Sequence, residues 1–217
     1  MIKRNTIIYD MDGTTLNTLD DLTASMNHVM GKYGFPLHSA EEYRRVFGSG
    51  IRYALEQSVP RTTPPDTIDE MIPAFKEHYN VHCLDKTRPY DGIIPLMKQL
   101  QSLGFKQAIV SNKIDSAVKE LNEKFFSEVI NVAIGERPEI RRKPAPDTVF
   151  EALRELGSLP GEAVYIGDSE VDLATARNAG LPCISVLWGF RDRDCLMETG
   201  ADIFAASPED ILSLLRH

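Results

Sequence analysis

Two carboxylates stand two positions apart directly after a short apolar run. Asp10 and Asp12 follow residues 6–9, a Thr-Ile-Ile-Tyr run that predicts a buried strand. Two unit charges about 4 Å apart repel by roughly 4 kcal/mol at an effective dielectric near 20, so we expect a cation or a shared proton between them. A hairpin turn at Asp12-Gly13 is the alternative, but a helical pattern follows it instead of a second alternating strand.

Other polar residues that could share a site with this pair follow the later apolar runs. Ligands of open parallel sheets bind beyond the carboxyl ends of the strands, so residues just after each predicted strand are candidates. They are Ser111 and Asn112 after the second run, Lys143 in a loop after the third, and Asp168 and Asp172 after the fourth. Alone, Ser111 could cap a helix and Lys143 could be an ordinary loop charge. Together with the acidic pair, they suit a divalent cation such as Mg²⁺ and a phosphate.

Short apolar runs alternate with helical patterns along most of the chain. Strands are predicted at residues 6–9, 107–110, 129–134, 163–166 and 183–186. Helices are predicted at residues 93–103, 148–156 and 170–179, and each ends at a glycine. This alternation predicts an α/β fold with a Rossmann-like parallel sheet as its core.

One long interval breaks the alternation. Between residue 18 and about residue 87 no convincing strand occurs, while Thr18 with Asp21 and Ser39 with Glu42 have the spacing of helix capping boxes. Apolar residues at helical spacing after Thr18 indicate a core-facing stripe. We therefore predict a helical cap domain at residues 17–88, inserted into a core domain formed by residues 1–16 and 89–217.

The composition limits the class of partner. The 217 residues carry a formal net charge of -8, which disfavours nucleic acid and anionic membranes as partners and favours a small ligand. Cys83, Cys183 and Cys195 are odd in number and lack metal-ligand spacing, so they predict neither a disulfide framework nor a zinc site. The chain contains no signal-peptide pattern and no stretch of 18 apolar residues. We expect a cytoplasmic protein.

Four segments in order resemble the motifs of the haloacid dehalogenase-like superfamily. They are residues 10–14 (DMDGT), 110–113 (VSNK), 143–146 (KPAP) and 167–172 (GDSEVD). The resemblance spans nearly the whole chain, and residues 188–191 (WGFR) are similar to the tail of the phosphoglycolate phosphatase-type branch. It implies that the helical interval corresponds to the cap of that family.

The resemblance also implies roles for the acidic residues. Asp10 would be the nucleophile that forms an aspartyl-phosphate, while Asp12 would give a proton to the leaving alkoxide and later take one from water. Mg²⁺ would be bound by Asp10, the backbone carbonyl of Asp12, and Asp168. Asp172 would order the outer shell of the metal or Lys143.

The same resemblance assigns phosphate binding to Ser111, Asn112 and Lys143. We therefore expect a Mg²⁺-dependent phosphatase of small phosphorylated metabolites, with 2-phosphoglycolate as the leading substrate. Two alternatives are a sugar-phosphate phosphomutase and a regulatory module that binds phosphate without turnover. The sequence leaves monomer and homodimer equally open.

A segment of the predicted cap could recognise the rest of the substrate. Gly48-Ser49-Gly50-Ile51-Arg52 precedes and opens a predicted helix, so its free N–H groups and Arg52 could bind an anionic tail such as a carboxylate. The alternative is a flexible turn beside a surface arginine.

Overall fold

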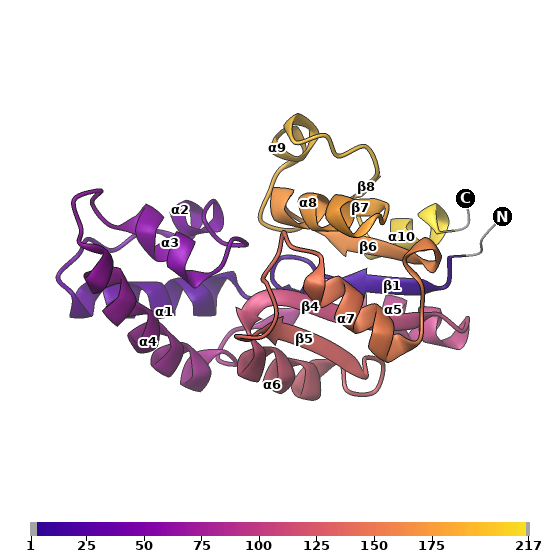
Figure 1. Ribbon diagram of the computed structural model, residues 1–217, viewed down its shortest axis with the longest axis horizontal. Coiled ribbons are helices and arrows are strands. Elements are labelled where there is room, and N and C mark those ends of the chain that lie inside the picture. Colours follow the sequence, from indigo (N-terminus) through magenta and orange to yellow (C-terminus); the bar gives the residue numbers. More distant parts are fainter. Residues whose placement is uncertain (1–3, 216–217) are drawn as a thin grey trace.

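A six-stranded parallel sheet forms the centre of the molecule in the computed structural model, which describes residues 4–215. The strand order is β5-β4-β1-β6-β7-β8, and every neighbouring pair is parallel (Figure 1). The strands are β1 (Thr6–Tyr9), β4 (Lys106–Ile114), β5 (Val132–Glu136), β6 (Ala163–Gly167), β7 (Cys183–Val186) and β8 (Phe204–Ala205). The predicted α/β class is confirmed.

Helices cover both faces of this sheet. Ile7 and Tyr9 of β1 belong to one buried cluster, and Ile8 belongs to another. The first cluster includes side chains of α5 (Ile93–Ser102), α6 (Asp115–Phe125) and α10 (Pro208–Leu214). The second includes side chains of α7 (Asp147–Leu156), α8 (Glu170–Ala179) and α9 (Arg193–Glu198). Burial on both faces explains why the central strands are continuous apolar runs in the sequence.

Four further helices form a separate bundle beside the sheet, which we call the helical insert (Figure 1). They are α1 (Leu19–Lys32), α2 (Ala40–Arg44), α3 (Ile51–Ser58) and α4 (Pro65–His82), and they share a third buried cluster. An antiparallel pair, β2 (Leu16–Asn17) and β3 (Arg88–Pro89), joins the two segments that connect the insert to the sheet. Two adjacent chain segments therefore connect the insert to the sheet.

Several strand boundaries differ from the predictions. The strands at residues 6–9 and 183–186 are confirmed, and β6 extends its prediction by one residue. β4 is much longer than predicted because it continues past a register shift between Val110 and Ile114, so Ser111 and Asn112 lie within the strand. The strand predicted at 129–134 begins later, since Val129 and Ile130 form a turn whose N–H groups bond to the carbonyl of Phe126. β2, β3 and β8 have two residues each, too few to show a periodicity.

The predicted helix starts have mixed outcomes. The capping box at Ser39 and Glu42 is confirmed. The one at Thr18 and Asp21 is wrong, because Thr18 Oγ1 donates to Asp12 and the Asp21 carboxylate accepts the N–H groups of residues 86 and 87. A capping box needs Thr18 Oγ1 to accept the N–H of Asp21, and the Thr18 side chain forms no such bond. Among residues 4–215, no helix combines the length and the apolar composition needed to cross a membrane.

Candidate active site

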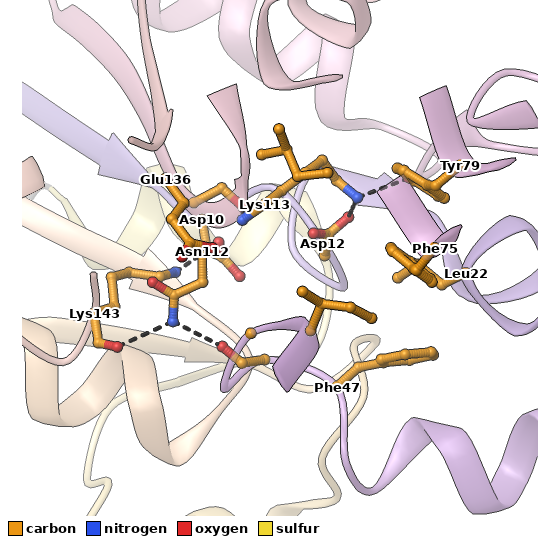
Figure 2. A pocket seen from close by; sticks show the side chains of 15 residues that line it. Asp10, Asp12, Leu22, Phe47, Phe75, Tyr79, Asn112, Lys113, Glu136 and Lys143 are labelled. Carbon is orange, nitrogen blue, oxygen red and sulfur yellow. Dashed lines mark hydrogen bonds and ion pairs between the residues drawn. The ribbon is translucent and has the colours of Figure 1, made fainter. Parts of the chain in front are cut away.

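The predicted site residues meet at one edge of the sheet, where Asp10 and Asp168 follow β1 and β6, and Ser111 and Asn112 lie in the last part of β4. Asp10, Asp12, Ser111, Asn112 and Lys143 line one cavity between the sheet and the helical insert (Figure 2). The empty volume of this cavity, its open mouth included, is about 600 Å³.

Lys143 is the centre of a buried ion cluster. Its Nζ lies 2.7 Å from Oδ1 of Asp10 and 2.8 Å from Oδ1 of Asp172. It also donates to the hydroxyl of Tyr165 at 3.1 Å. Only 2% of the Lys143 side chain is exposed, and a buried charge is tolerated when it is paired and hydrogen-bonded. This ammonium therefore holds two carboxylates in place.

Burial and mutual repulsion shift the pKa values of this cluster. Burial, followed by the charge of Asp172, raises the pKa of Asp10 well above its usual range, although Lys143 acts in the opposite direction. The same two causes raise the pKa of Asp168 to about 7. Burial opposes the charged form of Asp172, but Lys143 lowers the pKa of that carboxyl. One ammonium among three carboxylates leaves an excess of negative charge, which a divalent cation would offset.

Three acidic residues could hold a metal ion. Asp10, Asp168 and Asp172 each place an oxygen within 4.8 Å of the others. Among residues 4–215, the Asp172 carboxylate accepts five hydrogen bonds, from Lys143 and Tyr165 on Oδ1 and from two backbone N–H groups and the Ser169 hydroxyl on Oδ2. The Asp168 carboxylate accepts two, neither from an ammonium, and that of Asp10 accepts one. Asp10 and Asp168 are therefore the better candidate ligands, with Asp172 supporting Lys143 from behind.

Two glycines allow Asp168 to reach the site. Its Oδ1 accepts from Thr14 Oγ1 at 3.1 Å, and its Oδ2 accepts from the N–H of Phe190 at 2.6 Å. Gly13 has a φ of 83°, and a Cβ there would lie 2.3 Å from Asp168 Oδ2. A Cβ on Gly189 would lie 2.3 Å from the Cβ of Asp168. Any larger residue at either position would push this carboxylate away.

Asp12 is bound by a lysine that was not among the predicted site residues. Its Oδ1 accepts from Thr18 Oγ1 at 2.7 Å and lies 3.1 Å from Nζ of Lys113. The same Nζ donates to the hydroxyl of Tyr79 on α4 at 2.7 Å (Figure 2). Lys113 stands two residues after Ser111, so the two-residue period of a strand could have indicated it. Tyr79 has no comparable signal in the sequence.

The remaining β4 residues link the sheet to its neighbours. Ser111 is buried, and its Oγ accepts from the N–H of Lys113 at 3.2 Å. Nδ2 of Asn112 donates to the carbonyls of Gly48 and Lys143, each at 3.0 Å. The Asn112 amide therefore connects the helical insert with the Lys143 loop. Phosphate binding by Ser111 and Asn112 stays a prediction.

The helical insert closes the cavity with a wall of different character. Figure 2 shows Leu22, Phe47 and Phe75 together on the side opposite Lys143. With Ile51 and Tyr79, they give this wall aliphatic and aromatic side chains. A substrate would meet charged groups at the sheet and mostly apolar groups at the insert.

Comparison with known proteins identifies the family. A family model described as haloacid dehalogenase-like hydrolase matches residues 7–186. The chain belongs to this family. A phosphoglycolate phosphatase of Mesorhizobium japonicum is 30% identical over 88% of this chain and 86% of that protein. Pyrophosphatase PpaX of Halalkalibacterium halodurans is 29% identical over 97% of this chain and 96% of that protein.

A solved structure agrees with the family assignment. The fold of a proposed phosphoglycolate phosphatase from Lactobacillus delbrueckii subsp. bulgaricus matches with a TM-score of 0.94 and 35% identity, covering 98% of each chain. The resemblance inferred from the four motifs is thus confirmed. This haloacid dehalogenase-like protein is a phosphoric monoester hydrolase.

Arg52 pairs with two carboxylates and is not among the residues that line the cavity. In this hydrolase its guanidinium pairs with Asp69 of α4 and lies 3.6 Å from Glu56 of its own helix. Its neighbour Ile51 lines the cavity, whereas the Arg52 side chain is 41% exposed and lies outside the lining. Contact of Arg52 with a substrate stays a prediction. An anionic group of the substrate would compete with the carboxylates of Asp69 and Glu56 for this guanidinium.

Proposed function

We propose that this hydrolase is a Mg²⁺-dependent phosphatase of small phosphomonoesters, acting through an aspartyl-phosphate on Asp10. The strongest support is the position of Asp10 on the wall of the cavity, bound to Lys143 and close to Asp168. We take 2-phosphoglycolate as the leading substrate, because the Mesorhizobium japonicum relative is named for activity on it.

The donor set of the site fits Mg²⁺. The carboxylates of Asp10 and Asp168 are hard oxygen ligands, and we add the backbone carbonyl of Asp12 as a third. Asp172 would lie in the outer shell of the metal, where it accepts hydrogen bonds from Lys143 and from backbone N–H groups. Bound Mg²⁺ would supply the positive charge that lets an anionic carboxylate approach an anionic phosphate.

The residues of the chain divide the reaction into two steps. In the first, an oxygen of Asp10 bonds to phosphorus as the bond to the leaving alkoxide breaks, and Asp12 gives its proton to that alkoxide. In the second, water bonds to phosphorus, Asp12 takes its proton, and the bond to Asp10 breaks. Ser111 and Lys143 would bind the phosphoryl oxygens in both steps.

The proposal extends to the partners and the location of the protein. We propose a small phosphorylated metabolite as the partner, rather than nucleic acid or a membrane, because the net charge is -8. The three cysteines are free, which supports a reducing cytoplasm. Either a monomer or a homodimer is compatible with a cavity formed within one chain.

A phosphoester panel tests the proposal. The purified protein is assayed for phosphate release from 2-phosphoglycolate, pyrophosphate and sugar phosphates, with Mg²⁺ and with chelator, beside the Asp10→Asn variant. We expect Mg²⁺-dependent release from at least one ester and a loss of roughly 10⁴-fold in the variant. Asp20→Asn, which changes an exposed acid of α1, is the matched control.

Two other functions would give different results in the same assays. A phosphomutase would exchange sugar-phosphate isomers without net release of phosphate. A regulatory module would bind phosphate but show no turnover on any ester. Either pattern would refute the phosphatase proposal.

A further inference from the structure

Both connections of the helical insert reach the carboxylate of Asp12. Thr18, directly before α1, donates to Asp12 Oδ1 at 2.7 Å. Tyr79, near the end of α4, accepts from Lys113, whose Nζ lies 3.1 Å from the same Oδ1. The start of α1 and the end of α4 are thus linked to one oxygen of the sheet domain, directly through Thr18 and indirectly through the pairing of Tyr79 with Lys113.

The insert is docked on the sheet in this arrangement. Arg191, in the loop after β7, donates to the carbonyls of Arg44 at 2.8 Å and Phe47 at 3.0 Å. Asn112 of β4 donates to the carbonyl of Gly48. These contacts hold the loop between α2 and α3 against the sheet, so the pairing of Lys113 with Tyr79 belongs to a closed insert.

The contacts of Lys113 with Asp12 and Tyr79 explain how its ammonium can be buried. Its side chain is only 3% exposed, and a buried ammonium requires a charged or hydrogen-bonding partner. Burial raises the pKa of Tyr79 well above its usual range, so that partner remains a neutral hydroxyl. The ring of Tyr79 lies 4.2 Å from Nζ, which adds a cation–π contact. Asp12 Oδ1 and the Tyr79 hydroxyl are therefore the two oxygens that hold the Lys113 ammonium, and Tyr79 fixes where Lys113 points.

The contacts of Asp12 are distributed unequally between its two oxygens. Among residues 4–215, its side-chain contacts with Thr18 and Lys113 both fall on Oδ1. Oδ2 has neither of these contacts, and Asp12 is one of the residues that line the cavity. A carboxylate anchored through one oxygen presents the other in a fixed direction, which is what proton transfer requires.

We infer that Lys113 is a positioning residue that orients Asp12 for proton transfer to the leaving group when Tyr79 of the closed insert holds it. The inference rests on the proposed phosphatase function and adds how one residue of the same site is oriented. The proton passes from the Asp12 carboxyl to the alkoxide oxygen as the ester O–P bond breaks and the bond from Asp10 to phosphorus forms. Lys113 neither gives nor takes a proton in this step.

The dependence of the rate on the leaving group distinguishes this role from a structural one. Phenyl phosphate and p-nitrophenyl phosphate differ little in shape, but p-nitrophenolate leaves without help from an acid. A misaligned Asp12 should therefore lower kcat/KM for phenyl phosphate much more than for p-nitrophenyl phosphate. This ratio reports the step that forms the aspartyl-phosphate, whereas kcat also includes its breakdown, in which Asp12 acts as base for both esters. A merely structural defect would slow both esters in the same proportion.

The principal experiment measures kcat and KM of Lys113→Met on both esters, with Lys98→Met as the matched surface control. Lys98 is exposed and, within the described residues 4–215, forms an ion pair only with Glu128. We expect Lys113→Met to lose about 10- to 100-fold in kcat/KM on phenyl phosphate, because general acid catalysis contributes about 10²–10⁴-fold, and about threefold or less on p-nitrophenyl phosphate. An equal loss on both esters would overturn the inference.

A second variant tests the role of the insert with a change that should leave the fold intact. Tyr79→Phe keeps the ring and removes only the hydroxyl, so the fold should persist. We expect the same preference for p-nitrophenyl phosphate with a smaller loss, about three- to tenfold on phenyl phosphate. Tyr53→Phe, on α3 and 40% exposed, is the control. A Tyr79→Phe variant that matches the wild type on phenyl phosphate would refute the role of the insert.

A double-mutant cycle checks that Lys113 acts through Asp12. In an Asp12→Asn background, Lys113→Met should cause no further loss on phenyl phosphate, since the aligned acid is already gone. A full additional loss would overturn the inference while leaving the phosphatase proposal intact. If the wild type releases phosphate from no ester, the proposed function fails and the inference fails with it.

Discussion

The two walls of the cavity contrast in chemistry and in the number of partners that hold each side chain. On the sheet side, Lys143 has three side-chain partners, and Asp168 accepts from a hydroxyl and a backbone N–H. On the insert side, Phe47 and Phe75 contact their neighbours mainly through apolar packing. The sheet wall is a network of charges, and the insert wall is a packed apolar surface.

This difference indicates which wall determines which property. Removing one member of a buried charge network leaves the others unpaired, so the sheet wall tolerates little change. Apolar surfaces accept changes that conserve volume. We therefore expect the sheet wall to carry the reaction and the insert wall to select the leaving group.

The largest effect should come from Lys143 on the sheet wall. Lys143→Met leaves Asp10 and Asp172 buried without their shared cation. We expect kcat to fall by about 10³-fold and unfolding in urea to show a loss of about 3 kcal/mol. Lys98→Met serves again as the control. Wild-type stability in the Lys143→Met variant would contradict the view of the sheet wall as a charge network.

A change on the insert wall should alter selectivity more than rate. Phe75 is buried, lines the cavity and stacks on Tyr79 with ring centroids 5.5 Å apart. We expect Phe75→Leu to shift the ratio of kcat/KM between a bulky and a small phosphoester by about tenfold. Phe150→Leu, at an exposed position, is the control. An equal change for every ester would show that this wall does not select substrates.

A smaller effect, on stability, should follow from the charge excess at Asp168. The pKa of its carboxyl is raised to about 7 in the folded protein, against an ordinary value of 3.8. The folded state thus binds this proton more tightly than the unfolded state. Protonated Asp168 therefore contributes to the free energy of unfolding below about pH 4, and this contribution is lost as the pH rises through 7.

Asp168→Asn should remove that loss. Without metal at pH 8, we expect its Tm to exceed that of the wild type by about 5 °C, with the difference nearly absent at pH 4. Differential scanning calorimetry with chelator measures both values. Added Mg²⁺ should then stabilise the wild type and not the variant. A lower Tm for the variant at pH 8 would contradict the proposed charge excess.

The smallest effect is expected at Arg52, outside both walls. Its guanidinium is engaged by Asp69 and Glu56, and exposed ion pairs contribute about 0–1 kcal/mol. Arg52→Ala should leave the KM for 2-phosphoglycolate within about twofold of the wild type. A tenfold increase confined to esters that carry a carboxylate would instead support the role predicted for Arg52 from the sequence.

The contrast between the walls also explains which residues could be predicted. Asp10, Lys143 and Asp168 follow strands of a parallel sheet, and the fold brings strand ends to one edge, so their chemistry and order were sufficient. The pairing of Lys113 with Tyr79 and that of Arg52 with Asp69 depend on how α4 packs. Helix periodicity shows which face is apolar but not which side chain it meets across the cavity.

The central claim is that Asp10 attacks phosphorus, and an acid-quench experiment tests it most directly. The protein is mixed with an active ester and Mg²⁺, quenched in acid within milliseconds, and mapped by mass spectrometry for a phosphoryl group. We predict phosphorylation of Asp10, increased in Asp12→Asn, where breakdown of the intermediate is slower, and abolished in Asp10→Asn. Phosphorylation of another residue would contradict the account. So would an Asp10 that stays unmodified during turnover in both the wild type and Asp12→Asn.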